Sequence, residues 1–170
     1  MKKNRENQVA TLVAKFLTKR VLNTEAIVRT FNPLWRAKKG FKVQDVDEHM
    51  MTFEFDNAEE VNKILRSEPW SFDRYLVVLQ KLDNATPVHE LNLNSVAIWV
   101  QVRNIPITHL NRMVAKELCE VIGVVDRETN DNEVDRGSFF RVRVHIDIYV
   151  PLCRGPGDVY YPLRKTKNVG

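Results

Sequence analysis

The chain has 170 residues, of which 44% are hydrophobic and 28% are charged. This composition is typical of a soluble globular protein with one domain or two small ones. No apolar run approaches the ~20 residues that a membrane span requires, so the composition excludes an integral membrane protein and we expect no membrane partner.

Two further features bear on the compartment. The N-terminal stretch is basic, but its apolar part is interrupted by Lys15, which argues against a signal peptide. Two cysteines, Cys119 and Cys153, are too few for a disulfide framework or a metal site. We therefore expect a protein that is not secreted and that resides in a reducing compartment, the nucleus or the cytoplasm.

The positive charge is concentrated at the start of the chain. Residues 1–42 hold eleven Lys and Arg against Glu6 and Glu25, a net charge of +9, whereas residues 43–150 carry −8 and residues 151–170 carry +3. Such asymmetry indicates either a surface for a polyanion or a solvated N-terminal tail, and both interpretations stay open. The candidate phosphate contacts are Lys15, Lys19, Arg20, Arg36, Lys38, Lys39 and Lys42.

The first predicted elements are a strand and a helix. Residues 1–8 are polar, and we expect them to be disordered. A β-rich run predicts a strand over 9–17. Asn23 is a suitable cap for a helix whose buried face would hold Ile27, Phe31, Leu34 and Trp35. Pro33 should kink or end this helix near Asn32.

Residues 41–82 complete a compact α+β unit. Strands over 41–47 and 50–55 are joined closely enough to form an antiparallel hairpin. Asn57 and Glu60 have the spacing of a capping box for a second helix, which ends by Ser67, and a strand follows over 75–82. The order β-α-β-β-α-β over residues 9–82 predicts a ferredoxin-like (RRM-like) unit, a four-stranded antiparallel sheet with two helices on one face.

A second, partial β-α-β-β unit is predicted over residues 96–150, after a polar linker at 83–95. Its first strand alternates cleanly over 96–103, and a helix over 109–122 would bury Leu110, Met113, Val114, Leu118, Val121 and Ile122. Gly123 would stop this helix, and the last strand covers 139–148. We expect this unit to pack on the first, and the stretch 151–170 to be irregular.

The outward faces of two strands in the second unit are candidate binding surfaces. One strand would present Trp99, Gln101 and Arg103, and the other Arg141, Arg143 and His145. Arg and aromatic side chains on one face can contact phosphate and stack on bases. The alternative is an ordinary solvated face. In the first unit, the positions of RNA-stacking residues hold Met50 and Thr52, and we expect Phe53 and Phe55 to be core residues.

Catalytic and metal chemistry find no support in the sequence. The four histidines lack the spacing of metal ligands, no Gly-rich phosphate loop is present, and no group completes an acid–base pair around Asp45 and Asp47. The sequence therefore predicts a protein that is not an enzyme and that has no cofactor.

Several stretches resemble the plant domain family DUF4283. They are Leu34-Trp35-Arg36, Phe53-Glu54-Phe55, Pro69-Trp70-Ser71-Phe72-Asp73 with LVVLQKL, Ile98-Trp99-Val100-Gln101-Val102, and RVRVHIDIYVPL. The similarity covers about residues 9–152. The resemblance implies a Gag-like protein, related to the first open reading frame of non-LTR retroelements, that binds nucleic acid. A CCHC zinc knuckle usually follows in the family. Cys153 and a Gly/Pro-rich stretch stand here instead, so we expect no zinc.

Two functional hypotheses follow. The first is a retroelement-derived, Gag-like module that binds single-stranded RNA or DNA with low sequence specificity. Its contacts would come from the seven candidate phosphate contacts named above, which we call the basic head, and from Trp99, Arg103, Arg141 and Arg143. The alternative is a protein-interaction or self-association module, a homo-oligomer formed through an open sheet face and the apolar surroundings of Trp70, Phe72 and Trp99.

Overall fold

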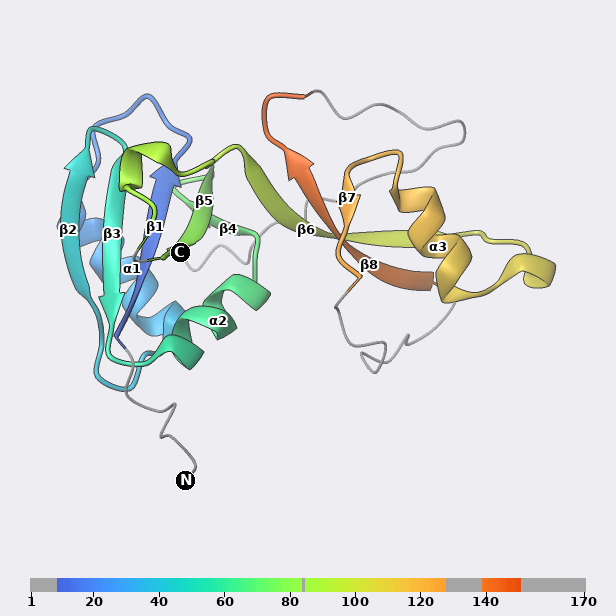
Figure 1. Ribbon diagram of the computed structural model, residues 1–170, viewed down its shortest axis with the longest axis horizontal. Helices are drawn as coiled ribbons and strands as arrows, with labels where there is room; N and C mark the ends of the chain where they lie inside the picture. Colours follow the sequence, from blue (N-terminus) through green and yellow to red (C-terminus); the bar gives the residue numbers. More distant parts are fainter. Residues whose placement is uncertain (1–8, 84, 128–138, 151–170) are drawn as a thin grey trace. The chain divides into compact units, whose positions relative to one another are not determined.

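The computed structural model describes residues 9–83, 85–127 and 139–150, so the expectations for 1–8 and for 151–170 fall outside it. The chain divides into two compact units, unit 1 (residues 1–93) and unit 2 (residues 94–170), which are considered separately. Both combine helix with antiparallel sheet (Figure 1), which confirms the predicted α+β class. No helix in the described ranges is long and apolar enough to cross a membrane.

Unit 1 is built on a five-stranded antiparallel sheet. Its strands, in the order β2-β3-β1-β5-β4, are β1 Ala10–Phe16, β2 Lys42–Asp47, β3 Met50–Phe55, β4 Trp70–Phe72 and β5 Tyr75–Leu82. The predicted succession of elements over 9–82 is present, with β4 in addition. This strand forms a hairpin with β5 through Asp73 and Arg74, whose φ angles are 47° and 69°. Two left-handed residues make the turn whose twist matches flanking strands.

Two helices, α1 Thr24–Trp35 and α2 Ala58–Arg66, cover one face of this sheet. As predicted, Asn23 caps α1, because its Oδ1 accepts a hydrogen bond from Ala26 N–H at 3.1 Å. The core between helices and sheet is aromatic: Phe31 stacks on Trp35 at 4.5 Å and meets Phe53 edge-on at 6.4 Å between ring centroids.

Of the two outcomes predicted for Pro33, an end of the helix near Asn32 is wrong. Helix α1 continues to Trp35, and Arg36 closes it in the left-handed conformation, with its N–H donating to the carbonyl of Asn32. Phe31 and Trp35 are buried on either side of the proline, so their packing holds the last turn in place despite the donor that Pro33 lacks. Leu34 was expected to be buried, but its side chain points away from the core and is 42% exposed.

The second half of the predicted capping box is also wrong. Asn57 Oδ1 accepts from Glu59 N–H at 2.8 Å, as a cap should. The carboxylate of Glu60 does not reach back to Asn57 but accepts from the backbone N–H of Lys38 at 3.0 Å. It therefore ties the start of α2 to the segment that follows α1.

The segment predicted as a linker, 83–95, is divided between the two units. A 3-10 helix, η2 Val88–Glu90, lies in unit 1, and Leu93 is only 4% exposed. Unit 2 begins at Asn94, immediately before its first strand.

Unit 2 contains a three-stranded antiparallel sheet in the order β6-β8-β7. The strands are β6 Ser95–Arg103, β7 Val124–Val125 and β8 Phe139–Asp147, and between β6 and β7 lie η3 Ile107–His109 and α3 Arg112–Cys119. The alternation predicted for the two long strands is confirmed: Ile98 pairs with Val144 and Val100 with Val142, and all four are buried.

Helix α3 is shorter than predicted, and a different face of it is buried. The residues in contact with the core are the small Ala115 (0% exposed) and Cys119 (1% exposed). Four of the six larger apolar residues expected there are exposed instead, and we call them the α3 stripe: Met113 and Leu118 within the helix, and Leu110 and Val121 just beyond its ends. The other two, Val114 and Ile122, are half-buried. The periodicity located the helix, but only packing against β8 determined which side faces inward.

Gly123 has a role other than the predicted helix stop. A Cβ at this position would lie 2.3 Å from the carbonyl oxygen of His145, a distance that no side chain tolerates. The glycine therefore allows the chain to approach the backbone of β8 closely, where β7 then pairs with it.

Candidate nucleic-acid interface

Strand pairing brings the two predicted surfaces of unit 2 onto one face of the sheet. Trp99 lies opposite Arg143, Gln101 opposite Arg141, and Arg103 opposite Phe139. Directly opposed residues of an antiparallel pair project to the same side. The six side chains therefore form a single surface, which we call the Trp99 face.

The arginines of the Trp99 face lie over aromatic rings. The guanidinium carbon of Arg141 is 4.9 Å from the centroid of Trp99, and that of Arg103 is 5.2 Å from the centroid of Phe139. Arg103 also donates from Nη2 to Gln101 Oε1 at 2.9 Å. A guanidinium held over a ring keeps its N–H edges available for a phosphate, and it loses less freedom when it binds one.

Arg143 was expected to face solvent, and that prediction is wrong. The residue is 8% exposed, its guanidinium carbon is 6.0 Å from the Trp99 ring, and its Nε lies 3.8 Å from Asp126 Oδ2. The same carboxylate oxygen is 3.9 Å from His145 Nε2. Arg143 thus holds Trp99 and Asp126 together, whereas Arg141 and Arg103 are more open to a ligand.

The structure does not gather the basic head into one patch. Lys15, near the end of β1, pairs with Met50, whereas Lys42 pairs with Glu54, which pairs with Thr11 at the other end of β1. Thr11 and Lys15 are four positions apart along the strand, about 13 Å. Lys19 and Arg20 follow Lys15 along the chain, while Arg36, Lys38 and Lys39 precede Lys42, so the head forms two groups.

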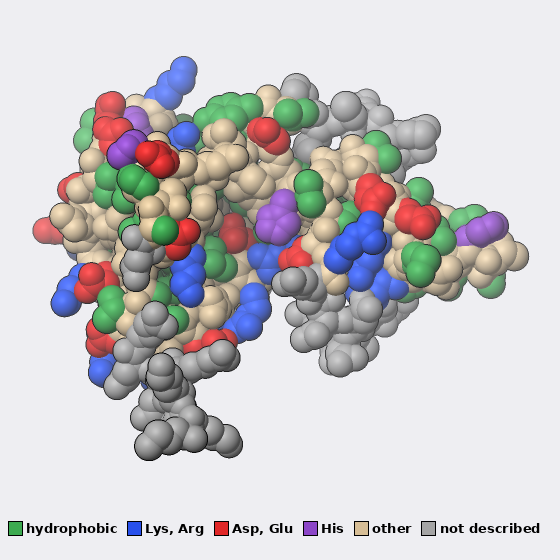
Figure 2. Space-filling model, in the orientation of Figure 1, with side chains coloured by type: hydrophobic (Ala, Val, Ile, Leu, Met, Phe, Trp, Pro, Cys, Tyr) green, Lys and Arg blue, Asp and Glu red, His purple; other side chains and the backbone are tan. Residues whose placement is uncertain are grey.

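Several head residues lie beside carboxylates. Arg20 Nη1 is 2.9 Å from Asp73 Oδ2, Lys39 Nζ is 3.6 Å from Asp56, and Lys42 Nζ is 3.7 Å from Glu54. Figure 2 shows basic and acidic side chains interspersed over unit 1. These pairs are exposed and weak, so a phosphate could compete for the cations, but the net field is lower than the +9 of the sequence indicates.

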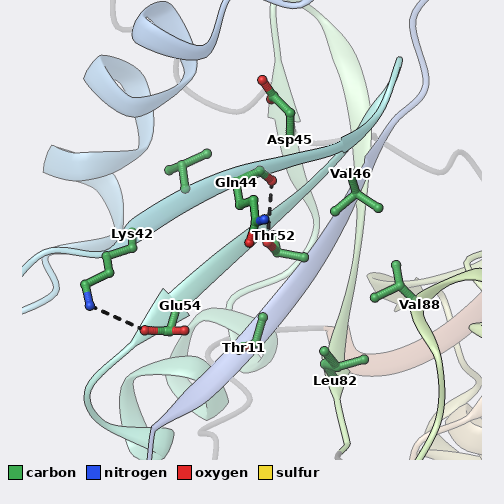
Figure 3. Close-up of a pocket in the computed structure, with 10 residues that line it drawn as sticks. Thr11, Lys42, Gln44, Asp45, Val46, Thr52, Glu54, Leu82 and Val88 are labelled. Carbon is green, nitrogen blue, oxygen red and sulfur yellow. Dashed lines mark hydrogen bonds and ion pairs between the residues drawn. The ribbon is translucent and has the colours of Figure 1, made fainter.

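The open face of the unit 1 sheet carries a groove of about 670 Å³ (Figure 3). Thr11 and Thr52 line its floor, Leu82 and Val88 one side, and the Lys42–Glu54 pair the other. With Asp45 the lining holds two carboxylates against one cation, so the groove does not favour a polyanion. Phe53 and Phe55 are 0% and 1% exposed, which confirms the prediction that they belong to the core.

Two kinds of reactive group can be assessed in the part of the chain that the structure describes, namely metal-ligand clusters and the Cys119 thiol. This part of the chain holds no group of three His, Cys, Asp or Glu side chains that could bind a metal ion. Burial raises the pKa of the Cys119 thiol to about 11, so this thiol stays protonated at neutral pH and is unsuited to nucleophilic attack.

Comparison with known proteins bears on unit 1. The model of the family "Domain of unknown function (DUF4283)" matches residues 4–90. The chain belongs to the DUF4283 family. An "Uncharacterized protein At4g02000" of Arabidopsis thaliana is 27% identical over 86 residues, which are 50% of this chain and 27% of that protein. The chain thus spans about a quarter of the length of this curated relative. No solved structure matches the chain.

The DUF4283 match ends at η2, before unit 2 begins. The Trp99 face therefore lies outside the matched residues. Two residues that support it, Phe139 and Asp126, were missed as site residues, because only the pairing of distant strands places them beside Arg103 and Arg143.

Proposed function

We propose that this DUF4283 protein is a non-catalytic module that binds single-stranded RNA or DNA with low sequence specificity. The observation that carries the proposal is the guanidinium of Arg141, 4.9 Å above Trp99 on a face that also holds Arg103 over Phe139. Single-strand binders commonly combine cations that follow the backbone with aromatic rings near the bases.

On the Trp99 face the arginines are the first contacts for a ligand. The ring of Trp99 already lies against Arg141, so a phosphate would meet the guanidinium before a base met the indole. Phosphate contacts carry no sequence information, which accounts for the low specificity. Binding should weaken with salt, with a slope of about −0.7 per neutralised phosphate on a single strand.

Unit 1 would contribute a scaffold and secondary contacts. The order β2-β3-β1-β5 with both helices on one face supports a ferredoxin-like, RRM-like assignment. The open face lacks the stacking aromatics of RNA-recognition modules, since Met50 and Thr52 stand there. Contacts from unit 1 would therefore come from exposed cations such as Lys19 and Lys38. A Gag-like, retroelement-derived origin, which the resemblance of the sequence implies, is part of the same proposal.

The test is fluorescence anisotropy of the full chain with labelled single-stranded RNA and DNA across a salt series. We expect binding with a steep salt slope, weakened about tenfold in Arg141→Gln, with the slope lowered by about 0.7. Lys63→Gln, an exposed cation on α2, is the matched control and should retain affinity. Absence of binding at low salt by the folded protein, or equal effects of the two variants, would refute the proposal.

Self-association is the second candidate function, and the exposed α3 stripe favours it. Met113 is 71% and Val121 74% exposed, an apolar surface typical of interaction sites. Two residues considered for this role contribute little: Trp70 and Phe72 pack against the unit 1 core, and Trp70 Nε1 donates to the carbonyl of Ile64 at 2.9 Å. Light scattering over a range of protein concentrations tests this candidate, and a monomer throughout would exclude it.

A further inference from the structure

Strand β6 lies at an edge of the unit 2 sheet. In the order β6-β8-β7 its one partner among the described residues is β8, with which it pairs over all nine residues from Ser95 to Arg103. Edge strands present unpaired backbone groups to any chain with an extended segment, and natural proteins usually shield them.

The register shows which backbone groups of β6 point outward. Asp126 N–H donates to the carbonyl of Arg143 at 2.9 Å, so the backbone groups of Arg143 face β7. Trp99 lies opposite Arg143, and residues of antiparallel strands alternate between the two sides. The N–H and C=O of Trp99 therefore point away from β8, as do those of Ala97 and Gln101. Among the described residues, no backbone hydrogen bond reaches these groups.

The other sheet edges carry the protection that β6 lacks. Edge strand β2 has a register shift between Asp45 and Asp47, and both of these residues are charged and exposed. Edges β4 and β7 are three and two residues long. By contrast, β6 has no charge and no proline before its last residue, Arg103. Bulges, charges and short length are the usual defences against edge pairing.

We infer that β6 pairs antiparallel with β6 of a second copy of this chain, about a two-fold axis at Trp99. Trp99 is the midpoint of the strand, so this register overlaps all nine residues. It places the buried-face residues Ile98 and Val100 opposite each other, so the apolar face continues from one copy to the next. It also places Arg103 opposite Ser95, and no like charges meet.

The resulting dimer has one continuous sheet, β7-β8-β6 of one copy followed by β6-β8-β7 of the other. Both Trp99 faces lie on the same side of that sheet, because outward-pointing residues pair with outward-pointing residues. A polyanion would then meet two sets of Arg103 and Arg141, which raises affinity through avidity. The dimer itself does not depend on the proposed nucleic-acid binding.

Site-directed cross-linking tests the register. Residues 99 of the two copies would lie about 5.5 Å apart between Cα atoms, within disulfide range. Residues 95 would be offset by eight positions, about 27 Å. In a background of Cys119→Ala and Cys153→Ala, Trp99→Cys should form a dimeric disulfide on mild oxidation, and Ser95→Cys should not. Equal cross-linking of the two variants, or of neither, would overturn the inference.

Removal of one outward-pointing backbone N–H of β6 tests whether this edge forms the dimer. Gln101→Pro deletes an N–H that faces away from β8 and leaves the β6–β8 bonds intact. Gln101→Thr, the matched control, keeps that N–H. We expect the dimer dissociation constant from light scattering to rise at least tenfold in Gln101→Pro and to stay within twofold in Gln101→Thr. A monomeric wild-type chain, or a dimer that survives Gln101→Pro, would overturn the inference, and the anisotropy result would stand either way.

Discussion

The two units of this protein differ in how the faces of their sheets are covered and how their edge strands end. In unit 1, large side chains of two helices, among them Phe31 and Trp35, fill one face of the sheet, and both of its edges are short or bulged. In unit 2, the helix meets the core through Ala115 and Cys119, and a nine-residue edge stays open. Among the described residues, the longest sheet edge without a bulge therefore belongs to unit 2.

The two units also differ in the groups that surround their positively charged side chains. Unit 1 holds the basic head, yet three of its cations, Arg20, Lys39 and Lys42, lie beside carboxylates. Unit 2 has fewer cations on its described surface, but Arg141 and Arg103 lie over aromatic rings. Net charge along the sequence therefore does not identify the surface on which the proposed nucleic-acid binding rests.

The largest expected effect comes from opening the aromatic core of unit 1. Phe53→Ala removes a fully buried ring that contacts Phe31, Trp35 and Phe41. We expect a loss of about 3–5 kcal/mol in the free energy of unfolding, measured by urea denaturation.

Met113→Ala on the exposed α3 stripe is the contrasting change. At 71% exposure, it should alter the free energy of unfolding by no more than about 0.5 kcal/mol. A loss of stability similar to that of Phe53→Ala would show that the α3 stripe is covered. The two units would then not differ in this respect.

Substitutions of one glycine in each unit are expected to have intermediate effects on the free energy of unfolding. Gly123→Ala places a methyl group against the carbonyl of His145, and we expect a loss of about 1–3 kcal/mol. Gly40→Ala meets open space but keeps a φ of 71°, so its cost should be about 1 kcal/mol. Thermal unfolding followed by circular dichroism measures both, and a neutral Gly123→Ala would contradict the close approach to β8.

The buried thiol of unit 2 predicts a pH dependence. Because burial raises the pKa of Cys119 to about 11, the native state keeps this proton in a range where the unfolded chain releases it. The contribution to stability is complete below about pH 9 and is lost as the pH rises toward 11. The stability difference between wild type and Cys119→Ala, from urea titrations at several pH values, should therefore narrow above pH 9. A constant difference would argue against the buried thiol.

The smallest expected effect concerns the exposed ion pairs of unit 1. Lys39→Gln and Lys42→Gln each remove one partner of a solvent-exposed pair, so each should change the free energy of unfolding by less than about 0.5 kcal/mol. Their effect on nucleic-acid affinity in low salt should be smaller than that of Arg141→Gln. A larger loss of affinity in Lys39→Gln or Lys42→Gln than in Arg141→Gln would indicate that the main nucleic-acid interface lies on unit 1.

Much of the secondary structure follows from the sequence alone. The alternation in β6 and β8, the cap at Asn23 and the core positions of Phe53 and Phe55 agree with the structure. Each of these signals lies within a few neighbouring residues, and local backbone geometry translates it directly into a strand, a helix end or a buried face.

Other features depend on contacts between segments that are distant in the sequence. Whether Pro33 ends its helix depends on the packing of Phe31 and Trp35, and which side of α3 is buried depends on the close approach of that helix to β8. The Trp99 face exists because β6 pairs with β8, whose residues lie some forty positions away along the chain. Local patterns specify elements, but contacts between distant segments select which faces meet, and for this protein those contacts create the candidate site.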